Sequence, residues 1–311
     1  MNLRIVGKYL SYLLWAEAAF MAVPALVSLY YGEFPSLGAF AASALLCVGA
    51  GWLFHLPCRG AKGALYIRES FVIAGTGWVF ISLFGAFPFF FSGGIPNFIN
   101  AFFESVSGFS TTGASILQDV GVLSKGLIFW RSFTLWLGGI GVVSFLVAIL
   151  HSQEGSGRSL NLLRAEIPGP QVGKLLPKTR ESIRMMYGIY LGLSGLTLLF
   201  LLLGRMPLFD ALCTMFGTAG TGGFSFRNDS FSSFSTYLQI VCAVFMALFG
   251  INFSLYFLLP RRQWKAFFKD EELRLYLSII AGAVVLVTIS LFSSGFGSLP
   301  QSLHHAFFTV S

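Results

Sequence analysis

The chain has 311 residues, of which 55% are hydrophobic and only 11% are charged, and its mean hydropathy is +0.76. A soluble globular domain carries about 25% charged residues, so this composition excludes a soluble domain and indicates an integral membrane protein. The net charge of +7 could suggest nucleic-acid binding, but the placement of the basic residues along the chain favours a different interpretation.

Apolar windows of the length needed to cross a bilayer, about 20 residues, recur along the whole chain. The first could include a cleaved signal peptide, because Ala16-Glu17-Ala18 resembles a small-residue cleavage site. Its apolar run continues to Tyr30, however, which is too long for a signal peptide and predicts a retained helix. The windows cover residues 9–31, 36–56, 70–91, 127–150, 183–204, 235–259 and 275–293.

The basic residues lie almost entirely between alternate pairs of these windows. With the N-terminus inside, segments 1–8, 57–69, 151–182 and 260–274, together with Arg184 at a helix edge, would be cytoplasmic. Cytoplasmic loops of membrane proteins carry an excess of Lys and Arg, so the pattern predicts a multi-pass protein with a cytoplasmic N-terminus, surrounded by lipid and not bound to nucleic acid. These segments hold 16 of the 20 basic residues: Arg4, Lys8, Arg59, Lys62, Arg68, Arg158, Arg164, Lys174, Lys178, Arg180, Arg184, Arg261, Arg262, Lys265, Lys269 and Arg274.

Two segments that would face outward, 96–118 and 207–229, are not covered by the windows. Each begins with about a dozen apolar residues and then becomes polar and rich in glycine. A dozen helical residues span about 18 Å, roughly half a bilayer. Non-helical backbone at that depth is tolerated only when it is buried in protein or lines a water-filled cavity. Each segment is therefore predicted to be a re-entrant short helix followed by a loop that lines a pore.

The two segments also repeat each other. "NAFFESVSGFSTTGAS" (100–115) aligns without a gap with "DALCTMFGTAGTGGFS" (210–225) at a shift of 110 positions. "HHAFFTVS" at the end of the chain resembles the start of the first copy. The predicted all-α fold is thus a series of helix–pore loop–helix units. Its parts are an N-terminal helix pair with its loop (1–69), a first unit (70–182), a second unit (183–274) and the start of a third (275–311).

Repeated pore loops of this kind are typical of ion channels. Selectivity filters replace the water around a cation with backbone carbonyls, glycine permits the positive φ that such loops need, and hydroxyl oxygens are further hard ligands for hard cations. A short helix would direct its negative C-terminal end at the pore. The predicted ion-binding residues are Ser110, Thr111, Thr112 and Gly113 in the first loop and Gly220, Thr221, Gly222 and Gly223 in the second.

Four charged residues near these loops have alternative interpretations. Glu104 could attract cations or brace the filter through hydrogen bonds, and bracing is favoured because the second copy has Thr214 at that position. Asp119 and Asp210 could concentrate cations at the outer mouth or be ordinary solvated loop residues. Arg131 is expected to extend toward water at the outer end of its helix, and blocking of the pore is a less favoured role.

The joint occurrence of several motifs identifies a family resemblance. "AFFESVSGFSTTGAS" followed by "FWRSFTLWLGGIGVV" (129–143), with "RAEIPGP" (164–170) and "GTGGFS" (220–225), resembles the Trk/Ktr/HKT superfamily of potassium transporters and is closest to its TrkH type. The resemblance implies four non-identical units around one pore, two additional N-terminal helices, and filter glycines at Gly113 and Gly223.

The same resemblance implies a function and partners. The activity would be potassium uptake across the bacterial inner membrane by the pore-forming subunit of a Trk system, with K⁺ as the transported ion and no cofactor. The membrane subunit would form a homodimer and bind a cytoplasmic, nucleotide-binding regulatory subunit of the TrkA kind, with loop 151–182 long enough to contact it. Relative to that family the chain ends inside the third pore helix, so the sequence predicts a fragment, a truncated product or one piece of a split transporter.

The sequence also bears on three other functional classes. A nonconducting truncated product and a secondary transporter for a different cation remain alternatives, although repeats in secondary transporters are often inverted. An intramembrane enzyme would need convergent acid, base or metal-binding residues, and only Glu17 and Glu104 lie clearly within apolar segments. The cysteines and histidines show no disulfide or metal-ligand spacing, so no enzymatic activity is expected.

Overall fold

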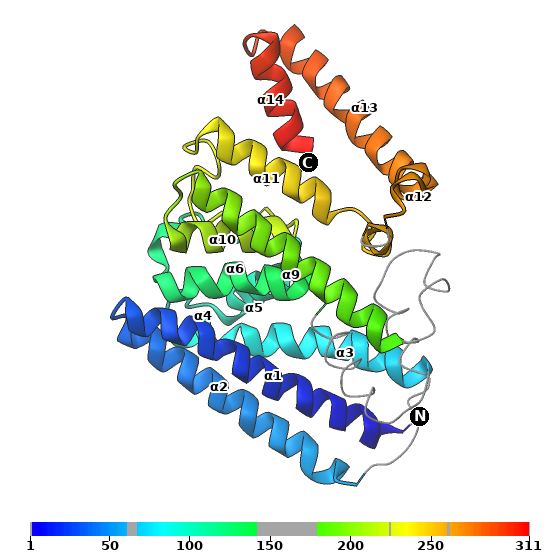
Figure 1. Ribbon diagram of the computed structural model, residues 1–311. Helices are drawn as coiled ribbons and strands as arrows, with labels where there is room; N and C mark the ends of the chain where they lie inside the picture. Colours follow the sequence, from blue (N-terminus) through cyan, green and yellow to red (C-terminus); the bar gives the residue numbers. More distant parts are fainter. Residues whose placement is uncertain (1, 61–66, 142–178, 224, 260–261, 311) are drawn as a thin grey trace.

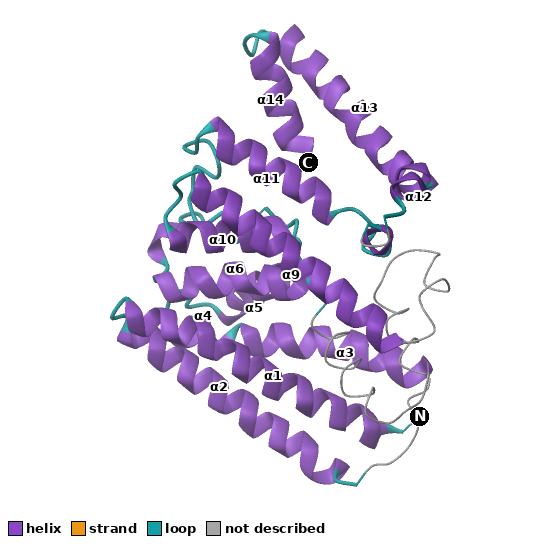
Figure 2. Ribbon diagram, viewed as in Figure 1, coloured by secondary structure: helices purple, strands orange, loops and turns teal. Residues whose placement is uncertain are grey.

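The structure is a computed structural model that describes residues 2–60, 67–141, 179–223, 225–259 and 262–310. The described residues form helices and turns without a strand (Figure 2), as the sequence predicts. The helices are α1 (Leu3–Tyr30), α2 (Phe34–His55), η1 (Leu56–Cys58), α3 (Ile67–Gly85), α4 (Phe87–Phe91), α5 (Phe98–Phe109), η2 (Val120–Val122), α6 (Lys125–Gly139), α9 (Thr179–Leu203), α10 (Leu208–Ala219), α11 (Thr236–Phe249), η5 (Leu255–Leu258), α12 (Trp264–Lys269), α13 (Glu271–Ser293) and α14 (Leu299–Val310).

Five segments of the described chain are long and apolar enough to cross a membrane. They correspond to the predicted windows 9–31, 36–56, 70–91, 183–204 and 275–293, and each contains an apolar stretch with few charges, as a spanning helix requires. The five spans are Leu3–Tyr30, Phe34–Cys58, Arg68–Phe91, Met185–Leu203 and Glu271–Ser293.

The expectation of one continuous helix over 235–259 is wrong. Helix α11 ends at Phe249, and η5 follows only at Leu255. The reason lies at Asn252, whose side-chain oxygen accepts a hydrogen bond from the Ser254 N–H at 2.9 Å. Such local side-chain bonds offer the backbone an alternative to the helical ladder. In the window 127–150, α6 ends at Gly139 and residues 142–150 lie outside the described part of the chain.

The two predicted pore helices, α5 and α10, lie at the centre of the molecule. Figure 1 shows α5, α6 and α10 in the middle, with α1 to α4 on one side and α11, α13 and α14 on the other. Helix α6 packs against both pore helices. Its fully buried Trp130 lies 6.0 Å from the ring of Phe109 on α5, and its Phe133 lies 5.3 Å from Phe216 on α10. Buried aromatic pairs of this kind dominate core energetics, so α6 is the shared support of the two pore helices.

The N-terminal helix pair is attached to this support at one end. The carboxylate of Glu33, between α1 and α2, accepts hydrogen bonds from the backbone N–H groups of Lys125 (2.7 Å) and Gly126 (2.9 Å). These are unpaired donors at the start of α6, where a negative charge is also favoured by the helix dipole. Glu33 therefore fixes the α1–α2 pair to the helix that supports the pore loops.

Candidate pore-loop site

The two predicted pore helices are present and end in register. Helices α5 and α10 have 12 residues each, which gives each a length of about 18 Å. Asn97 caps α5 by accepting the N–H groups of Ile99 and Asn100, and α10 begins directly after Pro207. Their last residues, Phe109 and Ala219, correspond under the shift of 110 positions that relates the two sequences.

Both helices continue into a loop of the same backbone conformation. In the first loop, the N–H of Thr111 donates to Gly108 O and the N–H of Thr112 donates to Ser107 O, each at 3.0 Å. The residues 110 positions later make the same two bonds at 3.1 and 3.3 Å. This pair of bonds is the Schellman motif that closes helix C-termini. The repetition read from the sequence therefore extends to individual backbone hydrogen bonds.

Four residues of the two loops have positive φ at corresponding positions. Thr111 and Thr221 have φ of 56° and 50°, and Gly113 and Gly223 have φ of 73° and 68°. The Schellman position is usually occupied by glycine, and a β-branched residue there is a genuine outlier. Strained backbone of this kind clusters at functional sites. The threonine in each loop is therefore a candidate functional residue.

The two loops approach each other backbone to backbone. A Cβ atom at Gly113 would overlap the carbonyl oxygen of Gly222, and a Cβ atom at Gly222 would lie 3.0 Å from the carbonyl oxygen of Thr111. Side chains at either position would separate the loops. Ser110 and Thr112 are exposed and share a hydrogen bond between their hydroxyl groups at 2.8 Å. In the second loop Gly220 is buried, whereas Thr221 and Gly223 are exposed.

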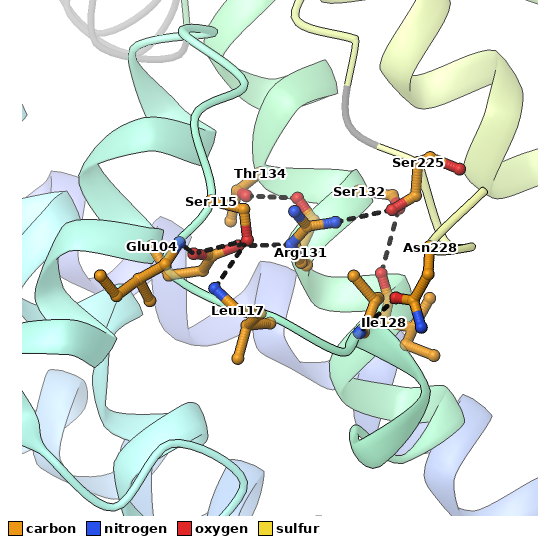
Figure 3. A network of polar contacts seen from close by, with 11 residues as sticks. Glu104, Ser115, Leu117, Ile128, Arg131, Ser132, Thr134, Ser225 and Asn228 are labelled. Carbon is orange, nitrogen blue, oxygen red and sulfur yellow. Dashed lines mark hydrogen bonds and ion pairs between the residues drawn. The ribbon is translucent and has the colours of Figure 1, made fainter. Parts of the chain in front are cut away.

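Glu104 joins the first pore helix to the chain that returns from the loop (Figure 3). The side chain is 1% exposed. Its carboxylate accepts hydrogen bonds from the Ser115 hydroxyl at 3.0 Å and from the Ile116 N–H at 3.0 Å. The carboxylate also pairs with Arg131 Nε at 2.5 Å. The Glu104 carboxylate thus connects α5 through charge-assisted bonds to the returning chain at Ser115 and Ile116 and to Arg131 on α6.

Arg131 continues the network to the second loop. Its Nη1 donates to the carbonyl oxygen of Ser225 at 2.8 Å (Figure 3). Ser115 and Ser225 are corresponding residues of the two copies, so the guanidinium lies between equivalent points of both loops. The expectation that Arg131 extends to water is wrong, because the residue is 3% exposed. Its burial is compensated by the Glu104 carboxylate and the Ser225 carbonyl, as a buried charge requires.

A second connection joins the outer parts of the two units. Asn228 donates through Nδ2 to Asp119 Oδ1 at 2.6 Å and accepts the Val120 N–H through Oδ1 at 2.8 Å. Asp119 also accepts the Gly121 N–H at 2.7 Å. Asp119 is therefore a structural partner of the second unit as well as an exposed loop residue. Asp210, by contrast, is partly buried and forms a long ion pair of 3.8 Å with the exposed Arg227, a geometry that contributes little.

Acidification is expected to weaken the connection at Asp119. The Asn228 side chain and then the Gly121 N–H lower the pKa of Asp119. A carboxyl group with a lowered folded-state pKa contributes stability above its unfolded pKa, about 3.9, and loses it as the pH falls through the folded value. The difference in thermal unfolding between wild type and Asn228→Ala should therefore be largest above about pH 4 and become smaller in more acidic buffer, where the bond from the Val120 N–H to Asn228 still remains in wild type.

An appropriate control is Asp229→Asn, which removes a neighbouring exposed carboxylate and should unfold in parallel with wild type across this range. A constant difference between wild type and Asn228→Ala at all pH values would show that ionised Asp119 does not support the contact.

Comparison with known proteins places this arrangement in one family. The chain matches the family of cation transport proteins named TrkH over residues 38–296. It is 34% identical to the Trk system potassium uptake protein TrkH of Halomonas elongata and 32% identical to TrkG of Escherichia coli. Each alignment covers 100% of this chain and 64% of the relative. The crystal structure of the potassium transporter TrkH from Vibrio parahaemolyticus matches with a TM-score of 0.84 at 26% identity, over 100% of this chain and 64% of that one.

The long apolar helices and the paired short helices with their loops define a helical membrane protein. More particularly, the chain belongs to the TrkH family of cation transport proteins, as the sequence motifs predict. It spans 64% of the length of the curated relatives described above.

Proposed function

We propose that this chain belongs to the pore-forming subunit of a Trk-type potassium uptake system. The observation that carries the proposal is the pair of adjacent loops with matching hydrogen bonds and matching positive φ angles. Loops of this kind present backbone carbonyls to a dehydrated cation. The names of the relatives describe potassium uptake, which supports K⁺ as the transported ion.

In this proposal residues 110–113 and 220–223 are two strands of the potassium filter. Gly113 allows close approach to the second loop, because its neighbour at that point is the Gly222 carbonyl. Thr111 and Thr221 hold strained left-handed conformations that glycine would adopt without strain, and the presence of threonine at both positions supports a role for the hydroxyl groups at the filter. Glu104 and Arg131 hold the two loops in register.

The proposed setting is the bacterial inner membrane with the N-terminus in the cytoplasm. Figure 1 shows the start of α1, the end of α2, the start of α3 and α12 at the same end of the molecule. The basic residues near these helix ends support a single cytoplasmic side.

The proposed partners are a second copy of the membrane subunit, forming a homodimer, and a nucleotide-binding regulatory subunit of the TrkA kind. The predicted contact loop, 151–182, lies outside the described residues except for the start of α9. The boundaries at 69, 182 and 274 stay predictions.

Flux measurements on the complete transporter test this function. The protein is reconstituted in vesicles with the regulatory subunit, and uptake of K⁺ and Na⁺ is measured separately. We expect K⁺ uptake well above that of empty vesicles, with Na⁺ taken up more slowly. Equal uptake of both ions would contradict the potassium filter, and uptake no faster than in empty vesicles would contradict the transport function.

A further inference from the structure

Glu17 is a buried carboxyl group that the proposed pore does not use. It lies near the middle of α1 and is 3% exposed. Neither of its carboxylate oxygens has a hydrogen-bond partner within the described part of the chain. Helix α1 packs against α2, α3 and α6. A polar group held without a partner in such a place needs a physical explanation.

The carboxyl group of Glu17 faces the first pore helix across a glycine. The point where a Cβ of Gly85 would stand lies 3.2 Å from Glu17 Oε1 and 2.8 Å from the hydroxyl oxygen of Ser105. Ser105 belongs to α5, is fully buried, and its hydroxyl also has no partner among the described residues. The Gly85 carbonyl is engaged by Trp130 Nε1 at 3.0 Å. Two buried oxygen-bearing groups therefore face the same small space, one from α1 and one from α5.

No basic side chain of the described parts of the surrounding helices forms a hydrogen bond with this carboxyl group. On α2 the facing titratable group is the buried thiol of Cys47. The other titratable groups of these helices lie at their ends or in the pore-loop network. His55 of α2 lies beside Ser11, and Glu69 of α3 accepts a hydrogen bond from the Asn2 N–H. The backbone N–H of Lys125, at the start of α6, is bound to Glu33.

The basic residues of α1 and α3 are also distant from Glu17 along the chain. Arg4 and Lys8 lie toward the start of α1, and Lys8 is about 13 Å from Glu17 along the helix axis. Arg68 begins α3, and Glu104 of α5 pairs with Arg131 of α6.

An ionised carboxylate in this environment would be costly. Transfer of an unpaired charge from water into a protein interior costs several kcal/mol even after relaxation. A neutral carboxylic acid avoids that cost and gains an O–H donor, and the Ser105 hydroxyl offers an acceptor in the same space. The protonated form of Glu17 is thus the form that the burial and the missing cation both favour.

We propose that Glu17 is a proton-binding site in the membrane core, with its carboxyl group facing Ser105 of the first pore helix across Gly85. The step is a simple equilibrium in which the carboxylate takes a proton from water and returns it to water. The inference rests on the geometry of α1, α3 and α5 and does not depend on which ion passes the pore.

Infrared difference spectroscopy of the protein in lipid vesicles tests the protonation directly. The spectrum of wild type minus Glu17→Gln at neutral pH should contain the C=O stretch of a protonated carboxylic acid, shifted in heavy water. The matched control is Glu271→Gln, because Glu271 is exposed at the start of α13; its difference spectrum should contain carboxylate bands. Carboxylate bands in place of the acid band in the Glu17 spectrum would overturn the proposal.

Stability against pH gives a second readout. A group that binds its proton more tightly in the folded state contributes stability at low pH and loses it as the pH rises. Wild type should therefore lose more thermal stability than Glu17→Gln on going to alkaline buffer, and identical profiles would count against the site.

If Glu17→Gln does not fold, Ser105→Ala replaces it in the test. Because Ser105 faces the same small space as Glu17, the C=O stretch of the acid should change frequency in this variant, and an unmoved band would overturn the placement of the proton beside α5.

Discussion

Replacing Gly113 with alanine is expected to destabilise the protein by several kcal/mol and to abolish most K⁺ uptake. Two effects add at this position. The left-handed conformation with φ of 73° costs about 1–2 kcal/mol for any residue with a Cβ. The new methyl group would also overlap the carbonyl oxygen of Gly222, which is backbone and cannot move without displacing the second loop. Thermal unfolding and K⁺ flux in vesicles measure the two consequences.

Gly93 provides a matched control for the first of these effects. Its φ of 72° is almost the same, but no atom lies within 4 Å of the position of its Cβ. Gly93→Ala should therefore show only the conformational cost of about 1–2 kcal/mol and keep its uptake. Equal losses in the two variants would mean that close contact of the loops adds nothing to the constraint at Gly113.

Substitution of Gly113 with serine extends the test to selectivity. We expect a weaker preference for K⁺ over Na⁺, because the side chain separates two loops that are proposed to coordinate one ion. Unchanged selectivity together with unchanged flux would contradict the assignment of residues 110–113 to the filter.

The fold could be predicted well where local pattern determines it. Hydropathy predicts the long helices because the backbone polar groups of an apolar segment in lipid must be hydrogen-bonded within that segment. Five of the predicted windows correspond to helical spans of suitable length. The shift of 110 positions predicted two equivalent loops, and Thr111 and Thr221 have nearly equal φ. Sequence similarity at these positions therefore reflects a shared backbone requirement.

Contacts between segments distant in the chain could not be predicted in this way. Arg131 pairs with a residue 27 positions earlier and with a carbonyl 94 positions later, and no periodicity reports such a pairing. A charged residue inside the apolar stretch "IFWRSF" was a usable signal, because an arginine in such a place usually has a partner. Asn228 carried no signal, since an exposed asparagine in a polar loop is ordinary until its contact with Asp119 is known.

Glu104→Gln is expected to be the second highly disruptive substitution. Breaking one partner of a buried ion pair costs about 3–5 kcal/mol because the other charge is left uncompensated. Here that charge is Arg131, which is 3% exposed and also holds the Ser225 carbonyl. The neutral amide would further weaken the bonds from Ser115 and Ile116. Thermal unfolding should show the loss of stability, and the ratio of K⁺ to Na⁺ flux should fall as both loops lose their common support.

A double-variant cycle separates the ion pair from simple loss of packing. Arg131→Met alone should also be destabilising, but Glu104→Gln combined with Arg131→Met should cost clearly less than the sum of the single changes, because neither buried charge remains. Asp210→Asn is the control, since it breaks the long, solvent-accessible pair with the exposed Arg227 and should change stability by at most about 1 kcal/mol. Strict additivity of Glu104→Gln and Arg131→Met would mean that the two residues support the loops independently. Because Arg131 lies between Ser115 and Ser225, a strong coupling would instead show that one buried ion pair keeps both loops in register.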